Sequence, residues 1–254
     1  MNLVALIRGL LAALVSVVFV TAAMAQSAGP LEGKLFGSGN RALVVVLHGD
    51  LSRGGPANYH YSLASQIAAA NKGVSVLALL RPGYSDGAGL RSKGSNNNRS
   101  DHYTQKNNLA VAQTIQAMAK QVGTSRVVAV GHSGGAAQIG GVLGLAPGLV
   151  QRAVLVSCPC DIATWRKSRG RSAWRQSEAQ SPHLQIPRIA NGTRITLVVG
   201  ANDDNTTPQL SEAYLAAAKA RGLRASLVKV AGAKHNMEAA LQAAALKAVN
   251  AELK

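Results

Sequence analysis

Residues 127–136 read Val127-Val128-Ala129-Val130-Gly131-His132-Ser133-Gly134-Gly135-Ala136 and decide the fold that the sequence predicts. The apolar run predicts a buried strand, and G-H-S-G-G predicts a sharp turn into a helix. A serine on such a turn projects its hydroxyl group out of the sheet, which requires small neighbours such as Gly131 and Gly135. We therefore predict that Ser133 is a catalytic nucleophile. The alternative is a glycine-rich turn in which Ser133 only caps a helix.

The rest of the chain alternates apolar strands with amphipathic helices. The predicted strands are 34–36, 43–47, 74–80, 127–130, 153–156, 195–199 and 225–230. The predicted helices are 61–70, 105–122, 134–145, 208–221 and 237–252. This alternation is typical of an α/β fold with a mainly parallel central sheet and helices on both faces. Residues 26–254 are expected to form a single domain, and residues 158–192, which have no clear period, form a small insertion or lid before the strand that leads to Asp203.

The first 25 residues have the pattern of a signal peptide. Arg8 precedes the apolar run 10–20, and Ala23-Met24-Ala25 fits a cleavage site after Ala25. The alternative, an uncleaved anchor, is disfavoured because the apolar stretch is shorter than the roughly 20 residues that span a bilayer. No segment of 26–254 is predicted to cross a membrane. We expect a secreted or periplasmic protein.

The chain is strongly basic. It has 27 Lys and Arg residues against 11 Asp and Glu residues, a formal charge of +16, and loss of Arg8 with the leader leaves +15. Such a charge favours anionic partners. The basic run within residues 166–175 is most simply a solvated face, and the alternative is a surface for an anionic polymer. No nucleic-acid-binding module is present in the sequence, so no specific nucleic-acid partner is expected.

A serine nucleophile needs a base, and the base needs a carboxylate. His235 lies in the loop after the last predicted strand and is the predicted base. Asp203 follows the strand 195–199 and is the preferred acid, with Asp204 and Asp161 as alternatives. The order Ser133, Asp203, His235 is one of the known triad orders.

An oxyanion site needs two backbone N–H groups. The first is predicted to be that of Gly134, at the start of a helix. The second is predicted to come from Asp50, in the His48-Gly49-Asp50 loop, or from Leu51. Cys158 and Cys160 are expected to line the pocket or to pair weakly, and the sequence predicts no metal site and no cofactor.

The segments LVVVLHGD (43–50), VVAVGHSGG (127–135), TLVVGANDD (196–204) and AGAKHNM (231–237) resemble the α/β-hydrolases over nearly the whole of 26–254. GHSGG and RPGYSDG resemble compact members near the dienelactone hydrolases and the catalytic domains of prolyl oligopeptidases. The resemblance implies the same nucleophile, acid, base and oxyanion donors. The dienelactone enzymes often have a cysteine where this chain has Ser133.

The sequence thus predicts an exported serine hydrolase that cleaves carboxylic esters through an acyl-enzyme. Two alternatives remain open. One is a serine peptidase or aminopeptidase that acts on short peptides. The other is a non-catalytic protein that binds anionic polymers through the basic part of the insertion.

Overall fold

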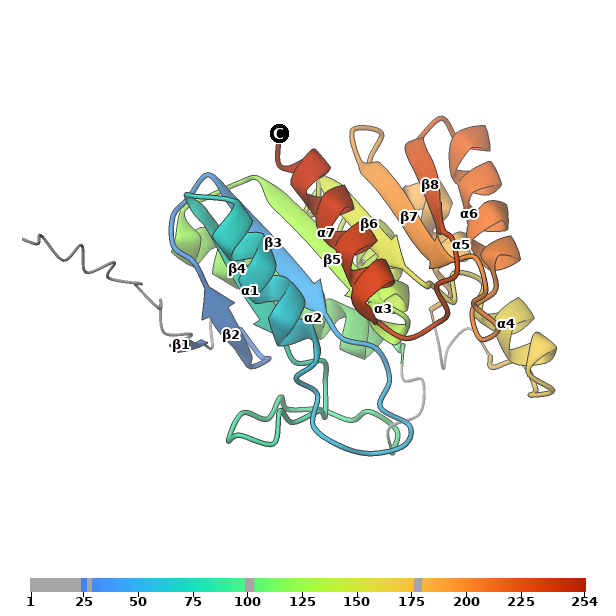
Figure 1. Cartoon of the computed structure of the whole chain (residues 1–254), viewed down its shortest axis with the longest axis horizontal. Helices are drawn as coiled ribbons and strands as arrows, with labels where there is room; N and C mark the ends of the chain where they lie inside the picture. Colours follow the sequence, from blue (N-terminus) through green and yellow to red (C-terminus); the bar gives the residue numbers. More distant parts are fainter. Residues whose placement is uncertain (1–23, 27–28, 99–102, 176–179) are drawn as a thin grey trace, which may run out of the picture.

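The computed structural model describes residues 24–26, 29–98, 103–175 and 180–254 (Figure 1). The strands are β1 (Met24–Gln26), β2 (Gly33–Phe36), β3 (Ala42–Leu47), β4 (Val74–Leu79), β5 (Val127–His132), β6 (Arg152–Val156), β7 (Arg194–Gly200) and β8 (Arg224–Val230). The helices are α1 (His60–Ala70), α2 (Gln105–Val122), α3 (Gly134–Leu145), α4 (Ile162–Ser168), α5 (Pro182–Gln185), the 3-10 turn η1 (Ile186–Arg188), α6 (Pro208–Ala220) and α7 (Ala239–Glu252). Most of the expected leader, residues 1–23, lies outside the described residues.

The strands form one eight-stranded sheet in the order β1-β2-β4-β3-β5-β6-β7-β8. β1 and β2 are antiparallel to their neighbours, and every pairing from β4 to β8 is parallel. The carboxyl ends of the parallel strands therefore meet at one edge, where working groups gather in such sheets. The predicted α/β fold with a mainly parallel sheet is confirmed.

Helices cover both faces of the sheet. α1 and α7 lie on the face turned to the viewer in Figure 1, and α2, α3 and α6 cover the other face. β3 is buried throughout because Val45 and Leu47 pack toward α2 and α3, whereas Val44 and Val46 pack toward α1 and α7. This double burial explains why the strand is a continuous apolar run rather than an alternating one.

The insertion at 158–192 has two parts with different positions. α4 lies beside the carboxyl edge of the sheet, whereas α5 packs on α3 so closely that a Cβ at Gly140 would come within 2.6 Å of Pro182. These elements are too short to give a periodic pattern in the sequence. Cys158 and Cys160 form a disulfide, and both are buried in the core rather than lining the site pocket.

Within the ranges that the structure describes, none of the helices combines the length and the apolar character that a membrane span requires.

Candidate active site

Ser133 lies at the turn between β5 and α3. Its backbone has φ of 52° and ψ of −119°, a strained conformation for a residue with a side chain. The turn depends on its glycines: a Cβ at Gly131 would lie 2.5 Å from the carbonyl carbon of Gly135, and one at Gly135 would lie 2.5 Å from the carbonyl oxygen of His48. No larger residue fits at either position without a backbone shift. The predicted elbow is therefore present, and the Ser133 side chain makes no capping hydrogen bond to α3.

His235 lies between Ser133 and Asp203. Its Nε2 atom is 3.1 Å from Ser133 Oγ, and its Nδ1 atom is 3.0 Å from Asp203 Oδ2. The loop that carries His235 can approach β7 closely because Gly200 has no side chain, and a Cβ there would meet the carbonyl oxygen of Ala233. Three residues that are far apart in the sequence thus form one hydrogen-bonded line at the carboxyl edge of the sheet.

The environment of Asp203 favours its carboxylate form. Burial alone would raise its pKa, but the hydrogen bond and charge of His235 and the Thr206 N–H hold the pKa below its usual value. Oδ1 accepts hydrogen bonds from the N–H groups of Asn205 and Thr206, at 3.0 and 2.8 Å, and Oδ2 accepts one from the Thr206 hydroxyl at 2.9 Å. Thr206, three residues after Asp203, is a partner that the sequence analysis missed.

The two alternative acids occupy other positions. Asp161 caps α4, where its carboxylate accepts hydrogen bonds from Thr164 N–H and Oγ1 at 3.1 and 2.7 Å. The Asp204 side chain is exposed, and its backbone carbonyl accepts a hydrogen bond from Arg169 at 3.3 Å. Among the described residues, only the Asp203 carboxylate contacts His235 in this way.

The predicted oxyanion donors lie on facing segments. Gly134 is the first residue of α3, where N–H groups have no partner within the helix. Gly49, which precedes Asp50, is so close to the turn that a Cβ there would lie 3.0 Å from the Cβ of Ser133. A Cβ at Gly134 would lie 2.6 Å from Asp50 Oδ1. The loop after β3 therefore borders Ser133 directly, as an oxyanion site requires.

Arg81 is a second residue that the sequence analysis missed. Its side chain is buried, and Nη1 lies 2.7 Å from Asp50 Oδ1 while Nε donates a hydrogen bond to Gln138 Oε1 at 2.9 Å. The Tyr103 hydroxyl also donates to the Asp50 carboxylate. Burial alone would lower the pKa of Arg81, but the Asp50 charge and neighbouring tyrosines raise it above its usual value. The Asp50 carboxylate beside the turn is therefore paired with a permanent cation.

His132 and His48 have supporting positions. His132 turns away from the Ser133 hydroxyl, as expected: its Nδ1 lies 2.6 Å from the Tyr59 hydroxyl and its Nε2 lies 2.8 Å from the carbonyl oxygen of His235. Burial, followed by the charge of His235, lowers the pKa of His132 to about 4, so the ring is neutral at pH 7. His48 is fully buried and accepts a hydrogen bond from Arg81 N–H at 3.1 Å.

A pocket of about 610 Å³ opens above Ser133 and His235. Its volume is within the usual range for small-molecule sites. Segments from the loop after β3, the region of α4 and the loop after β8 line it, and the lining residues are Asp50, Leu51, Ser52, Arg53, Gly54, Ser133, Trp165, Arg169, Arg171, Asp204, Asn205, Lys234, His235 and Asn236. The first part of the predicted insertion thus borders the pocket. In the described part of the chain, no group of three or more His, Cys, Asp or Glu residues could hold a metal ion.

Comparisons with known proteins agree with this architecture. Carboxylesterase from Mesorhizobium loti superposes with a TM-score of 0.62 at 18% identity, over 90% of this chain and 98% of that one. Monoacylglycerol lipase from Paleococcus ferrophilus gives 0.62 at 18%, over 88% and 98%. Est1E from Butyrivibrio proteoclasticus, solved with ferulic acid, gives 0.64 at 14%, over 91% and 99%. At these identities the likeness shows the fold.

No curated protein matches the sequence. Residues 44–188 match the Alpha/beta hydrolase family, and this match covers more than half of the chain, from β3 through the elbow to the insertion. This match, together with the sheet order and the turn at Ser133, shows that the chain belongs to the alpha/beta hydrolase family.

Proposed function

We propose that the chain is an exported serine hydrolase that cleaves carboxylic esters through an acyl-enzyme on Ser133. The observation that carries this proposal is the position of the His235 ring, 3.1 Å from Ser133 Oγ on one side and 3.0 Å from Asp203 Oδ2 on the other. Membership of the alpha/beta hydrolase family supports a hydrolytic reaction. The esterases and lipases among the solved structures of similar fold favour esters as substrates.

The geometry suggests a role for each group. His235 Nε2 takes the hydroxyl proton as Ser133 Oγ attacks the ester carbonyl, and the ionised Asp203 holds Nδ1–H and stabilises the imidazolium. The N–H groups of Gly134 and Asp50 bind the oxyanion of the tetrahedral intermediate. His235 then returns the proton to the leaving alcohol. A water molecule hydrolyses the acyl-enzyme by the same proton transfers, and Ser133 is regenerated.

Labelling with a fluorophosphonate probe tests the nucleophile. Wild-type protein should be labelled, and Ser133→Ala should lose both labelling and ester hydrolysis while it keeps the wild-type circular dichroism spectrum. Ser62→Ala is the matched control, because Ser62 is exposed on α1. A Ser133→Ala protein that still reacts with the probe contradicts the proposal. Comparison of p-nitrophenyl esters with aminoacyl amides separates an esterase from a peptidase.

Export is the part of the proposal that rests on residues 1–25. The buried disulfide between Cys158 and Cys160 supports it, because disulfides persist mainly in oxidising compartments. Expression of the full chain in a bacterium and mass spectrometry of the periplasmic fraction should give a mature protein that begins at Gln26. A full-length protein that stays in the cytoplasm contradicts export and leaves the proposed chemistry intact.

A further inference from the structure

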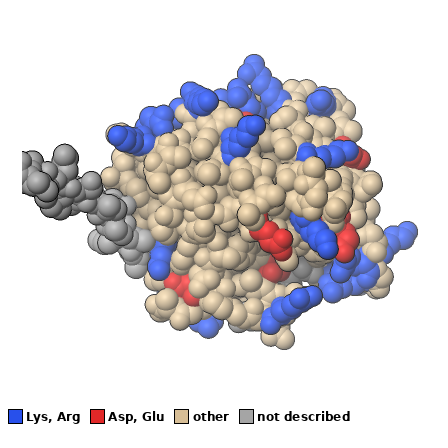
Figure 2. All heavy atoms as spheres, viewed as in Figure 1, with Lys and Arg blue, Asp and Glu red and all other residues tan. Residues whose placement is uncertain are grey.

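The pocket above Ser133 is rich in basic side chains. Arg53 comes from the loop after β3, Arg169 and Arg171 follow α4, and Lys234 directly precedes His235. In Figure 2, Lys and Arg side chains gather over the region where α4 lies in Figure 1, with few acidic side chains among them. Four cations from three separate segments of the chain thus line one small pocket that also contains the proposed nucleophile and base.

The acidic residues of the pocket do not neutralise Arg53, Arg169 or Lys234. The Asp50 carboxylate lies 2.7 Å from the buried Arg81 guanidinium, which does not line the pocket. Arg81 therefore balances the charge of Asp50. Asp204 is the other acid in the lining, and it holds Arg169 through its backbone carbonyl at 3.3 Å rather than through its carboxylate. Within the described ranges, no carboxylate lies at ion-pair distance from Arg53, Arg169 or Lys234.

The rest of the lining argues against a long apolar substrate. Leu51 and Trp165 are its large apolar members, and the Trp165 indole N–H donates to Asn205 Oδ1 at 3.3 Å. A pocket with cationic walls attracts anions and repels cations, and this field is stronger in a cleft than on an open surface. A carboxylate or a phosphate is the group that guanidinium and ammonium side chains bind best.

We propose that the ester substrate carries a negative charge, a carboxylate or a phosphate, which Arg53, Arg169 and Lys234 bind at the rim of the pocket. This inference rests on the proposed esterase function and adds the chemical class of its substrate. The charged group is covalently part of the acyl or the alcohol portion, so the cations hold the ester with its carbonyl toward Ser133. Charge-assisted hydrogen bonds of this kind correspond to a preference of about 10- to 100-fold in kcat/KM over a neutral ester.

Matched pairs of substrates test the proposal. For the acyl side, the mono-p-nitrophenyl ester of glutaric acid is compared with p-nitrophenyl pentanoate. For the alcohol side, 1-acetylglycerol 3-phosphate is compared with 1-acetylglycerol. We expect the charged member of at least one pair to be preferred by about tenfold or more, and we expect salt to reduce this preference. The favoured pair also tells whether the anion belongs to the acyl or the alcohol portion.

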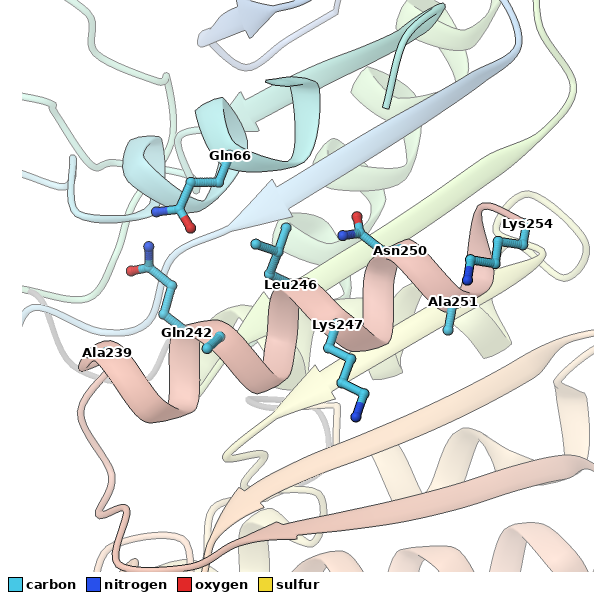
Figure 3. Close-up of a pocket in the computed structure, with 9 residues that line it drawn as sticks. Gln66, Ala239, Gln242, Leu246, Lys247, Asn250, Ala251 and Lys254 are labelled. Atoms are coloured by element: carbon cyan, nitrogen blue, oxygen red, sulfur yellow. The ribbon is translucent and has the colours of Figure 1, made fainter. Parts of the chain in front are cut away.

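Charge-removing variants locate the effect. Arg169→Gln and Lys234→Gln should each lower the ratio of charged to neutral kcat/KM by about fivefold or more. Lys247→Gln is the matched control, because it removes the same net charge from a groove on α7 that shares no residue with the site pocket (Figure 3). It should leave the ratio as in the wild type.

Three results overturn the proposal. The first is a wild-type protein that prefers the charged ester in neither pair. The second is a ratio of charged to neutral kcat/KM that Arg169→Gln and Lys234→Gln do not change, and the third is an equal loss of this ratio in Lys247→Gln. These results are distinct from a failure of the proposed function. If no ester is hydrolysed and the fluorophosphonate does not label Ser133, the hydrolase chemistry itself is wrong. If Ser133 is labelled and both members of each pair are hydrolysed equally, only the charge preference is wrong.

Discussion

The Nε2 atom of His132 lies 2.8 Å from the backbone carbonyl oxygen of His235. The neighbour of the proposed nucleophile on the elbow therefore holds the loop that carries the proposed base. The other ring nitrogen of His132 accepts a hydrogen bond from Tyr59, whose oxygen in turn accepts one from Gly49 N–H. The nucleophile turn, the base loop and the oxyanion loop are thus connected through one neutral imidazole.

We predict that His132→Gln lowers kcat by about 10- to 100-fold, because small misplacements of catalytic groups have effects of this size. KM for p-nitrophenyl esters should change much less, since His132 does not line the pocket. Steady-state kinetics on a folded variant measures both constants. His183→Gln is the control, because it makes the same substitution beside Asp161, at a distance from the proposed triad. It should leave kcat as in the wild type. A variant with wild-type kcat would show that the His132 contact has no positioning role.

Asp203→Asn tests the proposed acid in two ways. Ester hydrolysis should fall by about 10⁴-fold, because an amide cannot hold the imidazole in the correct tautomer or stabilise its cation. The wild type should also lose stability in acid. The pKa of Asp203 is lower in the native state than in the unfolded chain, where it is about 3.9. The contribution of Asp203 to the free energy of unfolding is therefore complete above the unfolded pKa and is lost as the pH falls through the native pKa.

Urea unfolding of both proteins between pH 7 and pH 3 measures the second effect. The free energy of unfolding of the wild type should fall more steeply below about pH 4 than that of Asp203→Asn. Parallel curves would mean that Asp203 has the same pKa in the folded and unfolded states. Asp204→Asn is the matched control, because Asp204 is exposed. This variant should show the same steep fall in the free energy of unfolding below about pH 4 as the wild type.

The longer strands and helices and the hydrogen-bonded line of Ser133, His235 and Asp203 were predictable from the sequence, whereas β1, α4, α5 and η1 were not. Each residue follows a predicted strand, and parallel strands bring their carboxyl ends to one edge. The elbow glycines carry a local signal, because their backbones approach other segments too closely for a side chain. The catalytic roles themselves remain proposals.

The supporting contacts were not predictable. Arg81 pairs with Asp50 across a loop that has no hydrophobic period, so nothing in the local sequence distinguishes it from a solvated arginine. Tyr59 meets His132 only after β3 and β5 pair. The disulfide between Cys158 and Cys160 was also not predictable, because sequence spacing does not tell how the backbone turns at Pro159.

Buried histidines should make the protein sensitive to mild acid. Burial lowers the pKa of His60 to about 3, so below about pH 6.5 the unfolded chain binds a proton that the native state excludes. Stability therefore falls as the pH drops from about 6.5 toward the native pKa. We predict that His60→Leu reduces the slope of the unfolding free energy against pH in this window by up to about 1.4 kcal/mol per pH unit. An unchanged slope in urea titrations would show that His60 takes up its proton in the folded state.

Removal of the cation beneath Asp50 should affect both stability and activity. Arg81→Met keeps an unbranched apolar side chain but removes the cation 2.7 Å from the Asp50 carboxylate, and breaking a buried pair in this way costs about 3–5 kcal/mol. A carboxylate without its counter-charge beside Gly134 also disfavours a developing oxyanion, so kcat should fall.

The double variant Arg81→Met with Asp50→Asn removes both charges and should recover part of each loss. Urea unfolding and ester kinetics on the three proteins measure the coupling. Additive losses in the double variant would show that the two side chains act independently, and the proposed compensation of Asp50 by Arg81 would be wrong.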